Sequence, residues 1–476
     1  MIRGYEVVIG LEVHAELNTA TKIYCSCKNS FGLEVNTQVC PICMGMPGTL
    51  PTLNEKVVEY AIKMGHALNC GINRISKQDR KNYFYPDLPK SYQISQSDIP
   101  LCHDGYLDVV MGNDIKRVGI ERIHIEEDAG KLLHSDKFDG SLVDFNRCGV
   151  PLIEIVSKPD MRSSDEAKAY LETIRSILKY IDISDCKMQE GSIRCDVNVS
   201  VHKPGEPFGT RCEMKNVNSF SAVVRGIDYE ANRQIDVIEA GGKVEQETRR
   251  WNDAKGESET LRSKEDAQDY RYFPEPDLLT IVVPQEKVQY LKDTLPELPN
   301  AKIMRYIKDC GLSYSDASMI VDVPEKSKLF DDCMAIGCKS PKIISNWILG
   351  EISKLMNDGI NLFETPLTPE KLVKIADYIS SGKISTASGK IVFDAVMQSD
   401  ADIDKVIEEK SLAQVSDTNE LESLAKKVIS ENEKSVTDYK NGKTNALGYL
   451  VGQCMKASKG KANPGIMKEI VLKLLQ

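Results

Sequence analysis

The hydrophobic pattern changes once along this chain, and that change limits the folds it can adopt. Residues 5 to 279 contain short runs in which apolar and polar residues alternate, such as IRCDVNVSV from Ile193. Alternation with a period of two is typical of a half-buried β-strand. After residue 302 the apolar residues recur at helical spacing instead. The sequence therefore predicts an α+β fold, with a sheet-containing N-terminal part and a helical C-terminal part.

Prolines mark the boundary between the two parts. The segment TLPELPNAK at residues 294–302 contains two prolines, and each biases the residue before it away from a helix. A chain of 476 residues is also too long for one hydrophobic core. We expect a sheet-containing domain at 1–294, a helical domain at 295–404 and a small helical tail domain at 405–476.

The net charge restricts the partners of the chain. A net charge of -10 argues against nucleic acid being held over the whole surface. The segment from residue 440 onward nevertheless contains seven lysines and one glutamate. This run is either a solvated helix face or a contact with an RNA backbone, and charge alone favours neither. If the run contacts RNA, the lysines that would do so are Lys440, Lys443, Lys456, Lys459 and Lys461.

Cysteine usage and hydropathy indicate a compartment. Fourteen cysteines occur without an export signal, and a reducing compartment keeps such thiols free or bound to metal. No apolar run is long enough to span a bilayer. We expect a cytoplasmic protein with no membrane contact.

Four of these cysteines form a compact motif. Cys25 and Cys27 form C-x-C, and Cys40 and Cys43 form C-P-I-C twelve residues later. Two short-spaced thiolate pairs suit a tetrahedral zinc ion. A redox disulfide is the competing interpretation, but two pairs so close together favour metal. The motif predicts a zinc knuckle whose role is structural, because all four positions are filled by protein ligands.

Two acidic strands suggest a site for a hard cation. In VIGLEVHAEL, period-two alternation puts Glu12 and His14 on one face. In VGIERIHIEED it puts Glu126 and Glu127 on opposite faces. Carboxylate oxygens are the ligands that Mg²⁺ prefers.

Residues 193–217 are predicted to form a hairpin with one polar face. That face is either the wet side of an antiparallel sheet or, with the acidic strands, a site for Mg²⁺ and a triphosphate. Its candidate residues are Arg194, Asp196, Asn198, Arg211, Glu213 and Lys215.

Several common chemistries are excluded by their missing motifs. The chain contains no G-x-x-x-x-G-K-[ST] loop, no G-x-G-x-x-G fingerprint, no H-E-x-x-H helix and no G-x-S-x-G turn. Any nucleotide site must therefore be of a less familiar kind.

Long blocks of the sequence resemble a known family. IGLEVHAEL, CPICMGMPGTLPTLN, YFYPDLPKSYQISQ, RIHIEEDAGK, EGSIRCDVNVSV and YRYFPEPDL closely resemble the B subunit of the bacterial and organellar glutamyl/aspartyl-tRNA amidotransferase. The resemblance spans essentially the whole chain. It implies a catalytic cradle domain followed by a helical domain and a tail domain that contacts tRNA.

The resemblance also implies an activity and partners. The family uses ATP and Mg²⁺ to activate the side-chain carboxylate of Glu or Asp, mischarged on tRNA, as an acyl phosphate. Ammonia made by an amidase A subunit then displaces the phosphate, and a small C subunit completes the complex. The resemblance further implies one structural Zn²⁺.

Individual residues follow from the matching blocks. The resemblance implies that Glu12, His14, Glu126 and Glu127 bind magnesium, and that Asp196 and Glu213 complete the catalytic site. Substrate-binding or ammonia-path roles fall to Lys81, Lys90, Arg194, Asn198 and Lys215.

Two rival functions remain for comparison. A non-catalytic, zinc-containing RNA-binding protein would show no Mg²⁺-dependent ATP hydrolysis. A stand-alone carboxylate-amine ligase would act without tRNA or partner subunits.

Overall fold

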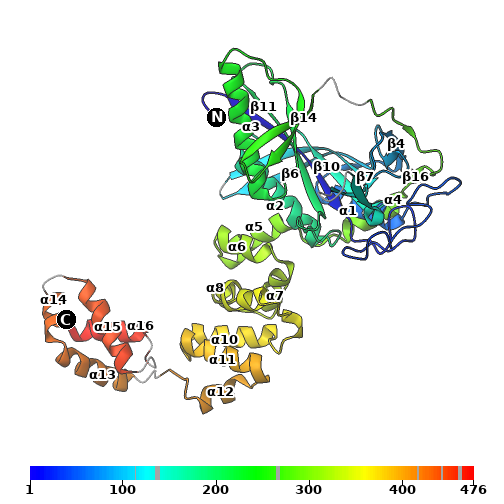
Figure 1. Cartoon of the computed structure of the whole chain (residues 1–476). Coiled ribbons are helices and arrows are strands. Elements are labelled where there is room, and N and C mark those ends of the chain that lie inside the picture. Colours follow the sequence, from blue (N-terminus) through cyan, green and yellow to red (C-terminus); the bar gives the residue numbers. More distant parts are fainter. Residues whose placement is uncertain are drawn as a thin grey trace. The chain divides into compact units, whose positions relative to one another are not determined.

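The computed structural model describes residues 1–112, 114–134, 140–263, 269–414, 418–440, 443–458, 462 and 464–475. The chain divides into two compact units, Met1–Lys302 and Ile303–Gln476. The first contains the sheets and the second is helical (Figure 1). The predicted switch from alternating to helical periodicity is confirmed, and the fold is α+β.

A large, mostly antiparallel sheet dominates the first unit. Within the described residues it has nine strands in the order β14-β13-β12-β11-β1-β10-β7-β6-β2. Strand β1 lies in the middle, between β10 and β11, and β11 pairs with β12 as the predicted hairpin. The strands are β1 Glu6–Glu16, β2 Gly71–Ile72, β6 Cys102–Met111, β7 Asp114–Glu127, β10 Pro151–Ser157, β11 Ile193–His202, β12 Cys212–Lys215, β13 Glu247–Asn252 and β14 Glu257–Ser263.

Three helices cover the apolar side of this sheet. Alternate residues of β1, such as Leu11 and Val13, are fully buried because their side chains point toward the helices. The N-cap of the second helix is Ser163, whose hydroxyl accepts a hydrogen bond from the backbone N–H of Glu166. The helices are α1 Glu55–Ala67, α2 Ser164–Tyr180 and α3 Phe220–Glu239.

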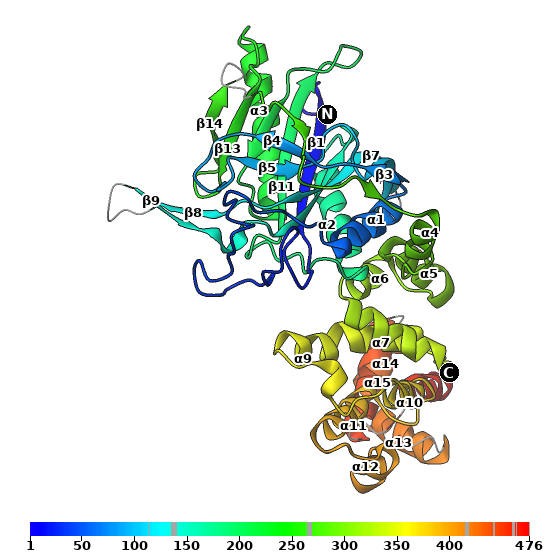
Figure 2. The ribbon, with the colours of Figure 1, turned by 90° about the vertical axis from the view of Figure 1, so that its right-hand side faces the viewer.

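A smaller, three-stranded sheet in the order β15-β4-β5 packs on the end of β7. Strands β3 and β16, which in the sequence precede β4 and follow β15, form a short pair of their own. Hairpin β8–β9 extends away from the large sheet (Figure 2). A single 3₁₀ turn, η1, follows this hairpin. The elements are β3 Ile75–Ser76, β4 Asp79–Asn82, β5 Tyr92–Ser95, β8 Lys131–His134, β9 Ser141–Asp144, η1 Phe145–Arg147, β15 Phe273–Pro274 and β16 Ile281–Val282.

The second unit is built from short helices. Its last four helices enclose a core of their own, which includes Leu421, Leu450 and Val471. Among the described residues, no helix is long and apolar enough to cross a membrane. The helices from residue 285 onward are α4 Gln285–Asp293, α5 Pro299–Cys310, α6 Tyr314–Val321, α7 Pro324–Ala335, α8 Pro341–Trp347, η3 Ile348–Ile352, α9 Ser353–Asn357, η4 Leu362–Glu364, α10 Pro369–Ser380, α11 Thr386–Ser399, α12 Ile403–Glu409, α13 Thr418–Glu431, α14 Glu433–Lys440, α15 Asn445–Ala457 and α16 Pro464–Leu475.

The expected domain boundaries lie close to features of the structure but do not coincide with them. Leu295 and Leu298, which lie in the segment expected to form the boundary, pack against the core of the first unit. Residue 405 lies inside α12, whereas the separate tail core begins with α13. The three-domain division remains a prediction.

Candidate functional site

Ionisable side chains from neighbouring strands meet on the face of the large sheet opposite the helices. Glu12 on β1 lies directly opposite Asp196 on β11. His14 lies opposite Glu154 on β10, and Glu154 lies opposite His124 on β7. Directly opposed residues of an antiparallel pair share a face. The sheet therefore brings together residues that are far apart in the sequence.

One group on this face, the acid–histidine cluster, consists of His14, His124, Glu126 and Glu154. The Nε2 atom of His14 lies 3.3 Å from Oε2 of Glu154 and 3.7 Å from Oε1 of Glu126. The Nε2 atom of His124 lies 3.2 Å from the same Glu154 oxygen and 3.5 Å from Oε2 of Glu126. Each carboxylate is thus shared between the two imidazoles.

Burial and charge compete within the acid–histidine cluster. Burial disfavours the charged form of His124, but Glu154 and Glu126 more than offset it and raise the pKa of His124 to about 9. Burial alone would raise the pKa of Glu154, whereas His124 and His14 hold that pKa well below its usual range. Opposite charges therefore balance in this buried part of the face.

A second group, the carboxylate cluster, consists of Glu12, Asp196 and Glu213. One oxygen of each carboxylate lies within 4.8 Å of an oxygen of the others. Lys215 is 2.6 Å from Oδ2 of Asp196 and 2.8 Å from Oε1 of Glu213. Two of these carboxylates contact the same ammonium, and the three together form an oxygen-rich site that suits Mg²⁺.

Neighbouring side chains orient the carboxylate cluster. Asn198 donates a 3.0 Å hydrogen bond to Oε1 of Glu12, and Thr248 on β13 donates a 2.8 Å bond to Oε2 of Glu213. Burial, followed by the nearby Glu154, raises the pKa of Glu12. A cavity of about 300 Å³ adjoins Glu12 and is also lined by Asn198 and Arg211. The geometry offers a space beside the carboxylates with a guanidinium at its wall.

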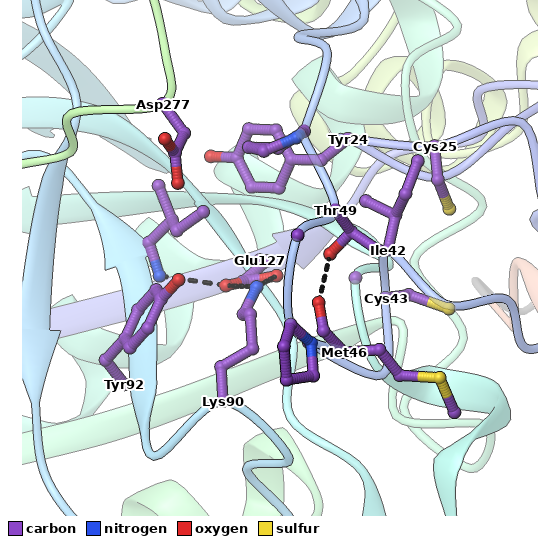
Figure 3. A pocket seen from close by; sticks show the side chains of 16 residues that line it. Tyr24, Cys25, Ile42, Cys43, Met46, Thr49, Lys90, Tyr92, Glu127 and Asp277 are labelled. Carbon is purple, nitrogen blue, oxygen red and sulfur yellow. Dashed lines mark hydrogen bonds and ion pairs between the residues drawn. The ribbon is translucent and has the colours of Figure 1, made fainter.

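Glu127 lies in different surroundings from Glu126, as the alternation predicted. Its Oε2 atom is 2.6 Å from Nζ of Lys90, and its Oε1 accepts a 2.9 Å hydrogen bond from the Ile94 N–H. Figure 3 shows Lys90 and Glu127 pointing toward each other in a cavity of about 200 Å³ that Asp277 also lines. The proposed magnesium ligands Glu12, His14, Glu126 and Glu127 are therefore divided among three places.

The four cysteines of the predicted knuckle come together. The sulfur atoms of Cys25, Cys27, Cys40 and Cys43 all lie within 4.8 Å of one another. Lys22 approaches the Cys43 sulfur to 3.8 Å, which favours a thiolate there. The cluster could hold a metal ion, and four thiolates are the donor set of a structural zinc site. Cys25 and Cys43 also line the cavity of Lys90 and Glu127.

The other candidate cations lie around the acid–histidine cluster. Arg194 lies opposite His14 on the same face, and its Nη2 atom is 3.0 Å from Oδ2 of Asp128. Burial disfavours the charge on Lys81, but Glu126 and other neighbours raise its pKa overall. Lys81 therefore stays charged close to Glu126.

Local sequence pattern alone assigns no role to Glu154, His124 and Asp128. Glu154 had a recognisable signal, since it is the one acid in the apolar run PLIEIV. A carboxylate inside a buried strand needs a charged or hydrogen-bonding partner. The identity of that partner depends on strand pairing, which local pattern does not reveal.

The described tail lysines lie on the surface. Lys440 and Lys456 are exposed, and Lys443 is 2.9 Å from Oδ1 of Asp438. Lys459 and Lys461 lie outside the described residues.

Comparison with known proteins shows which family the chain resembles. Residues 7–289 match the family model described as the GatB/GatE catalytic domain, and residues 328–475 match the model described as the GatB domain. The chain is 55% identical over 98% of both sequences to a protein of Thermoanaerobacter pseudethanolicus. It is 54% identical over 99% of both to one of Caldicellulosiruptor bescii and 50% identical over 98% of both to one of Clostridium botulinum. All three relatives are named as the B subunit of aspartyl/glutamyl-tRNA(Asn/Gln) amidotransferase.

Residues 7–289, which include both clusters, thus belong to the GatB/GatE class of catalytic domains. With matches of this identity over nearly its whole length, the chain belongs to the family of aspartyl/glutamyl-tRNA(Asn/Gln) amidotransferase B subunits. The resemblance stated from the sequence is confirmed.

Proposed function

We propose that this chain is the carboxylate-activating subunit of a tRNA-dependent amidotransferase. It would use ATP to activate the side-chain carboxylate of Glu-tRNA(Gln), Asp-tRNA(Asn) or both. The observation that carries this proposal is the convergence of the acid–histidine and carboxylate clusters on one sheet face, beside a cavity walled by Arg211. A non-catalytic RNA-binding protein is not favoured, because the relatives are named as amidotransferase subunits.

Conversion of the carboxylate into an amide requires two steps. A carboxylate oxygen of the substrate attacks the γ-phosphorus of ATP, so that a C–O–P bond forms and ADP leaves. Ammonia then attacks the acyl carbon, the C–N bond forms, and inorganic phosphate leaves with the displaced oxygen as one proton is lost. Activation is needed because a carboxylate is a poor electrophile. Positive groups that meet the developing negative charge lower the barrier of both steps.

The residues of this sheet face fit this chemistry. The oxygens of Glu12, Asp196 and Glu213 would hold Mg²⁺, and His14, Glu126 and Glu154 offer a second donor set. Bound Mg²⁺ would supply positive charge against the phosphate oxygens. Arg211 and Lys215 would hold phosphate oxygens at the same face. Asn198 and Thr248 fix the orientation of two of the carboxylates.

Ammonia would arrive from a partner. The word subunit in the relatives' names supports a multi-subunit complex over a stand-alone ligase. We propose an amidase A subunit and a small C subunit as partners, and the cavity of Lys90 and Glu127 as part of the ammonia path, with Lys81 closer to the acid–histidine cluster. A structural Zn²⁺ in the cysteine cluster, tRNA contact by the tail lysines and a cytoplasmic location complete the proposal.

The test is Glu154→Gln in the complex assembled with the amidase and C subunits. This change keeps the shape and removes the charge shared by His14 and His124, so amide formation on tRNA should fall about 100-fold or more. Glutamine hydrolysis by the amidase should remain measurable. Asp108→Asn on β6, which removes a half-exposed carboxylate that pairs with Arg117 on the same sheet, is the matched control. An unchanged rate for Glu154→Gln in a complex of normal composition would reject the proposed site.

A further inference from the structure

An exposed group of aromatic side chains lies on two segments that are far apart in the sequence. Phe84 is 80% exposed, Tyr85 52%, Tyr272 42% and Phe273 43%. Large aromatic groups left in water at this density mark an interaction surface. We name these residues, with the half-buried rings beside them, the aromatic patch: Tyr83, Phe84, Tyr85, Tyr270, Tyr272 and Phe273.

The two segments of the aromatic patch are fixed against each other. The ring centroids of Tyr83 and Tyr270 are 5.8 Å apart, those of Tyr270 and Tyr272 are 6.1 Å apart, and both pairs meet edge to face. Asn82 bonds the second segment through its backbone N–H to the Tyr270 carbonyl at 2.9 Å and through its side chain to the Arg271 carbonyl at 2.8 Å. The patch is therefore organised before any ligand arrives.

Cations accompany the rings. Nζ of Lys81 lies 4.8 Å from the centre of the Tyr270 ring. Cζ of Arg80 lies 5.7 Å from that of Phe273, and the same guanidinium donates hydrogen bonds of 2.6 and 2.8 Å to Glu275, so among the described residues Lys81 is the cation of the two that is not held in such a pair. Rings interleaved with cations form the surface that single-stranded nucleic acid prefers, because bases stack on aromatic faces and phosphates need positive charge. A purely apolar protein partner would have no use for the cations.

The aromatic patch adjoins the acid–histidine cluster through the three-stranded sheet. Ser95 on β5 lies opposite Asp79 on β4, and its hydroxyl donates a 3.3 Å hydrogen bond to Oε2 of Glu126. Lys81 lies two residues after Asp79 on β4. It is close enough to Glu126 and Glu154 for their charges to raise its pKa. A ligand on the patch would therefore have its end close to the proposed site of activation.

We propose that the aromatic patch stacks the unpaired nucleotides at the 3′ end of the aminoacyl-tRNA. This inference rests on the proposed function, and it names the part of the substrate that this surface receives. The amino acid of a charged tRNA is esterified to its terminal ribose, so the unpaired end must come within reach of the activating groups. Unpaired bases can be splayed onto aromatic side chains, whereas paired ones cannot.

The experiment measures tRNA binding by the complete complex. Two probes are compared: an uncharged tRNA with its intact 3′ end, and the same tRNA without its last unpaired nucleotides. For Tyr272→Ala and Phe84→Ala, affinity for the intact tRNA should fall about tenfold. Affinity for the shortened tRNA should stay the same, because that probe no longer reaches the patch.

Two matched variants separate stacking from other effects. Tyr272→Phe keeps the ring and should bind the intact tRNA as the wild type does. Leu279→Ala removes an apolar side chain that is 91% exposed in the same stretch and should change neither affinity.

Two results would overturn the inference. Equal losses for the intact and shortened tRNA would show that the patch does not read the 3′ end. Loss of the amidase subunit from the complex with unchanged tRNA affinity would make the patch a subunit interface. Amide formation by the wild-type complex is scored separately, so its absence would reject the proposed function whatever the two tRNAs show.

Discussion

Lys90 and Glu127 form a buried ion pair, with Nζ 2.6 Å from Oε2, at the wall of a cavity that also contains two of the clustered cysteines. If this cavity carries ammonia from the amidase, Lys90→Met should lower amide formation supported by glutamine about tenfold or more, because the unpaired Glu127 carboxylate would draw ammonium or water into the path. Amide formation supported by ammonium chloride should fall much less. Rates with the two nitrogen sources provide the measurement.

The double variant Lys90→Met with Glu127→Gln is the control for this experiment. It removes both charges, so it avoids leaving a buried carboxylate unpaired, a loss that costs about 3–5 kcal/mol. Equal losses with glutamine and with ammonium chloride would exclude a role in the ammonia path.

Purified protein should contain about one zinc ion per chain, bound by Cys25, Cys27, Cys40 and Cys43. Cys40→Ser should release the metal and lower the thermal midpoint, because zinc binding stabilises the folded knuckle. Elemental analysis and calorimetry measure the two effects. Cys310→Ser, outside the cluster, should retain the metal. An absence of zinc after purification without chelators would contradict the assignment.

Removal of the tail helices should weaken tRNA binding and flatten its salt dependence. The tail core begins with α13, so a truncation before Thr418 leaves α12 whole, which a truncation at residue 405 would not. Each lost lysine–phosphate contact lowers the slope of log affinity against log salt by about 0.9 for duplex-like RNA. Titrations of full-length and truncated complexes at several salt concentrations measure this slope. An identical slope would leave the tail lysines as a solvated face.

His66 should make the first unit less stable in mild acid. Its Nε2 atom lies 3.0 Å from the Val288 carbonyl of α4, and burial lowers its pKa below the ordinary value. The unfolded chain then takes up a proton at a higher pH than the folded chain does. This contribution to stability is present above pH ~6.5 and is lost as the pH falls through the lower, folded-state pKa.

Thermal midpoints at pH 7.5 and 5.5 test the role of His66. The wild type should lose more on acidification than His66→Gln does. His103→Gln, which changes a half-exposed histidine, should behave as the wild type does. Equal losses for the wild type and His66→Gln would contradict the prediction.

Local pattern predicted much of the site because alternation fixes the face of each side chain. It placed Glu12 and His14 on the same face of one strand, and it placed the neighbouring residues Glu126 and Glu127 on different faces of another. The structure has both arrangements. The cysteine cluster was equally accessible, since two close pairs joined by a short loop bring their sulfurs together with little help from the rest of the fold.

The sequence by itself determined the α+β class, the cysteine cluster, the polar face of each strand and the family. Only the tertiary structure decided which strands are neighbours. The order β12-β11-β1-β10-β7 joins Glu12 to Asp196 and Glu213, and it joins His14 to Glu126 and the unassigned Glu154. The physical reason is the distance along the chain over which each interaction acts. Side-chain direction follows from the backbone period of a single strand, whereas strand pairing comes from hydrogen bonds and core packing between different segments, and β1 lies more than a hundred residues from both of its partners, β10 and β11.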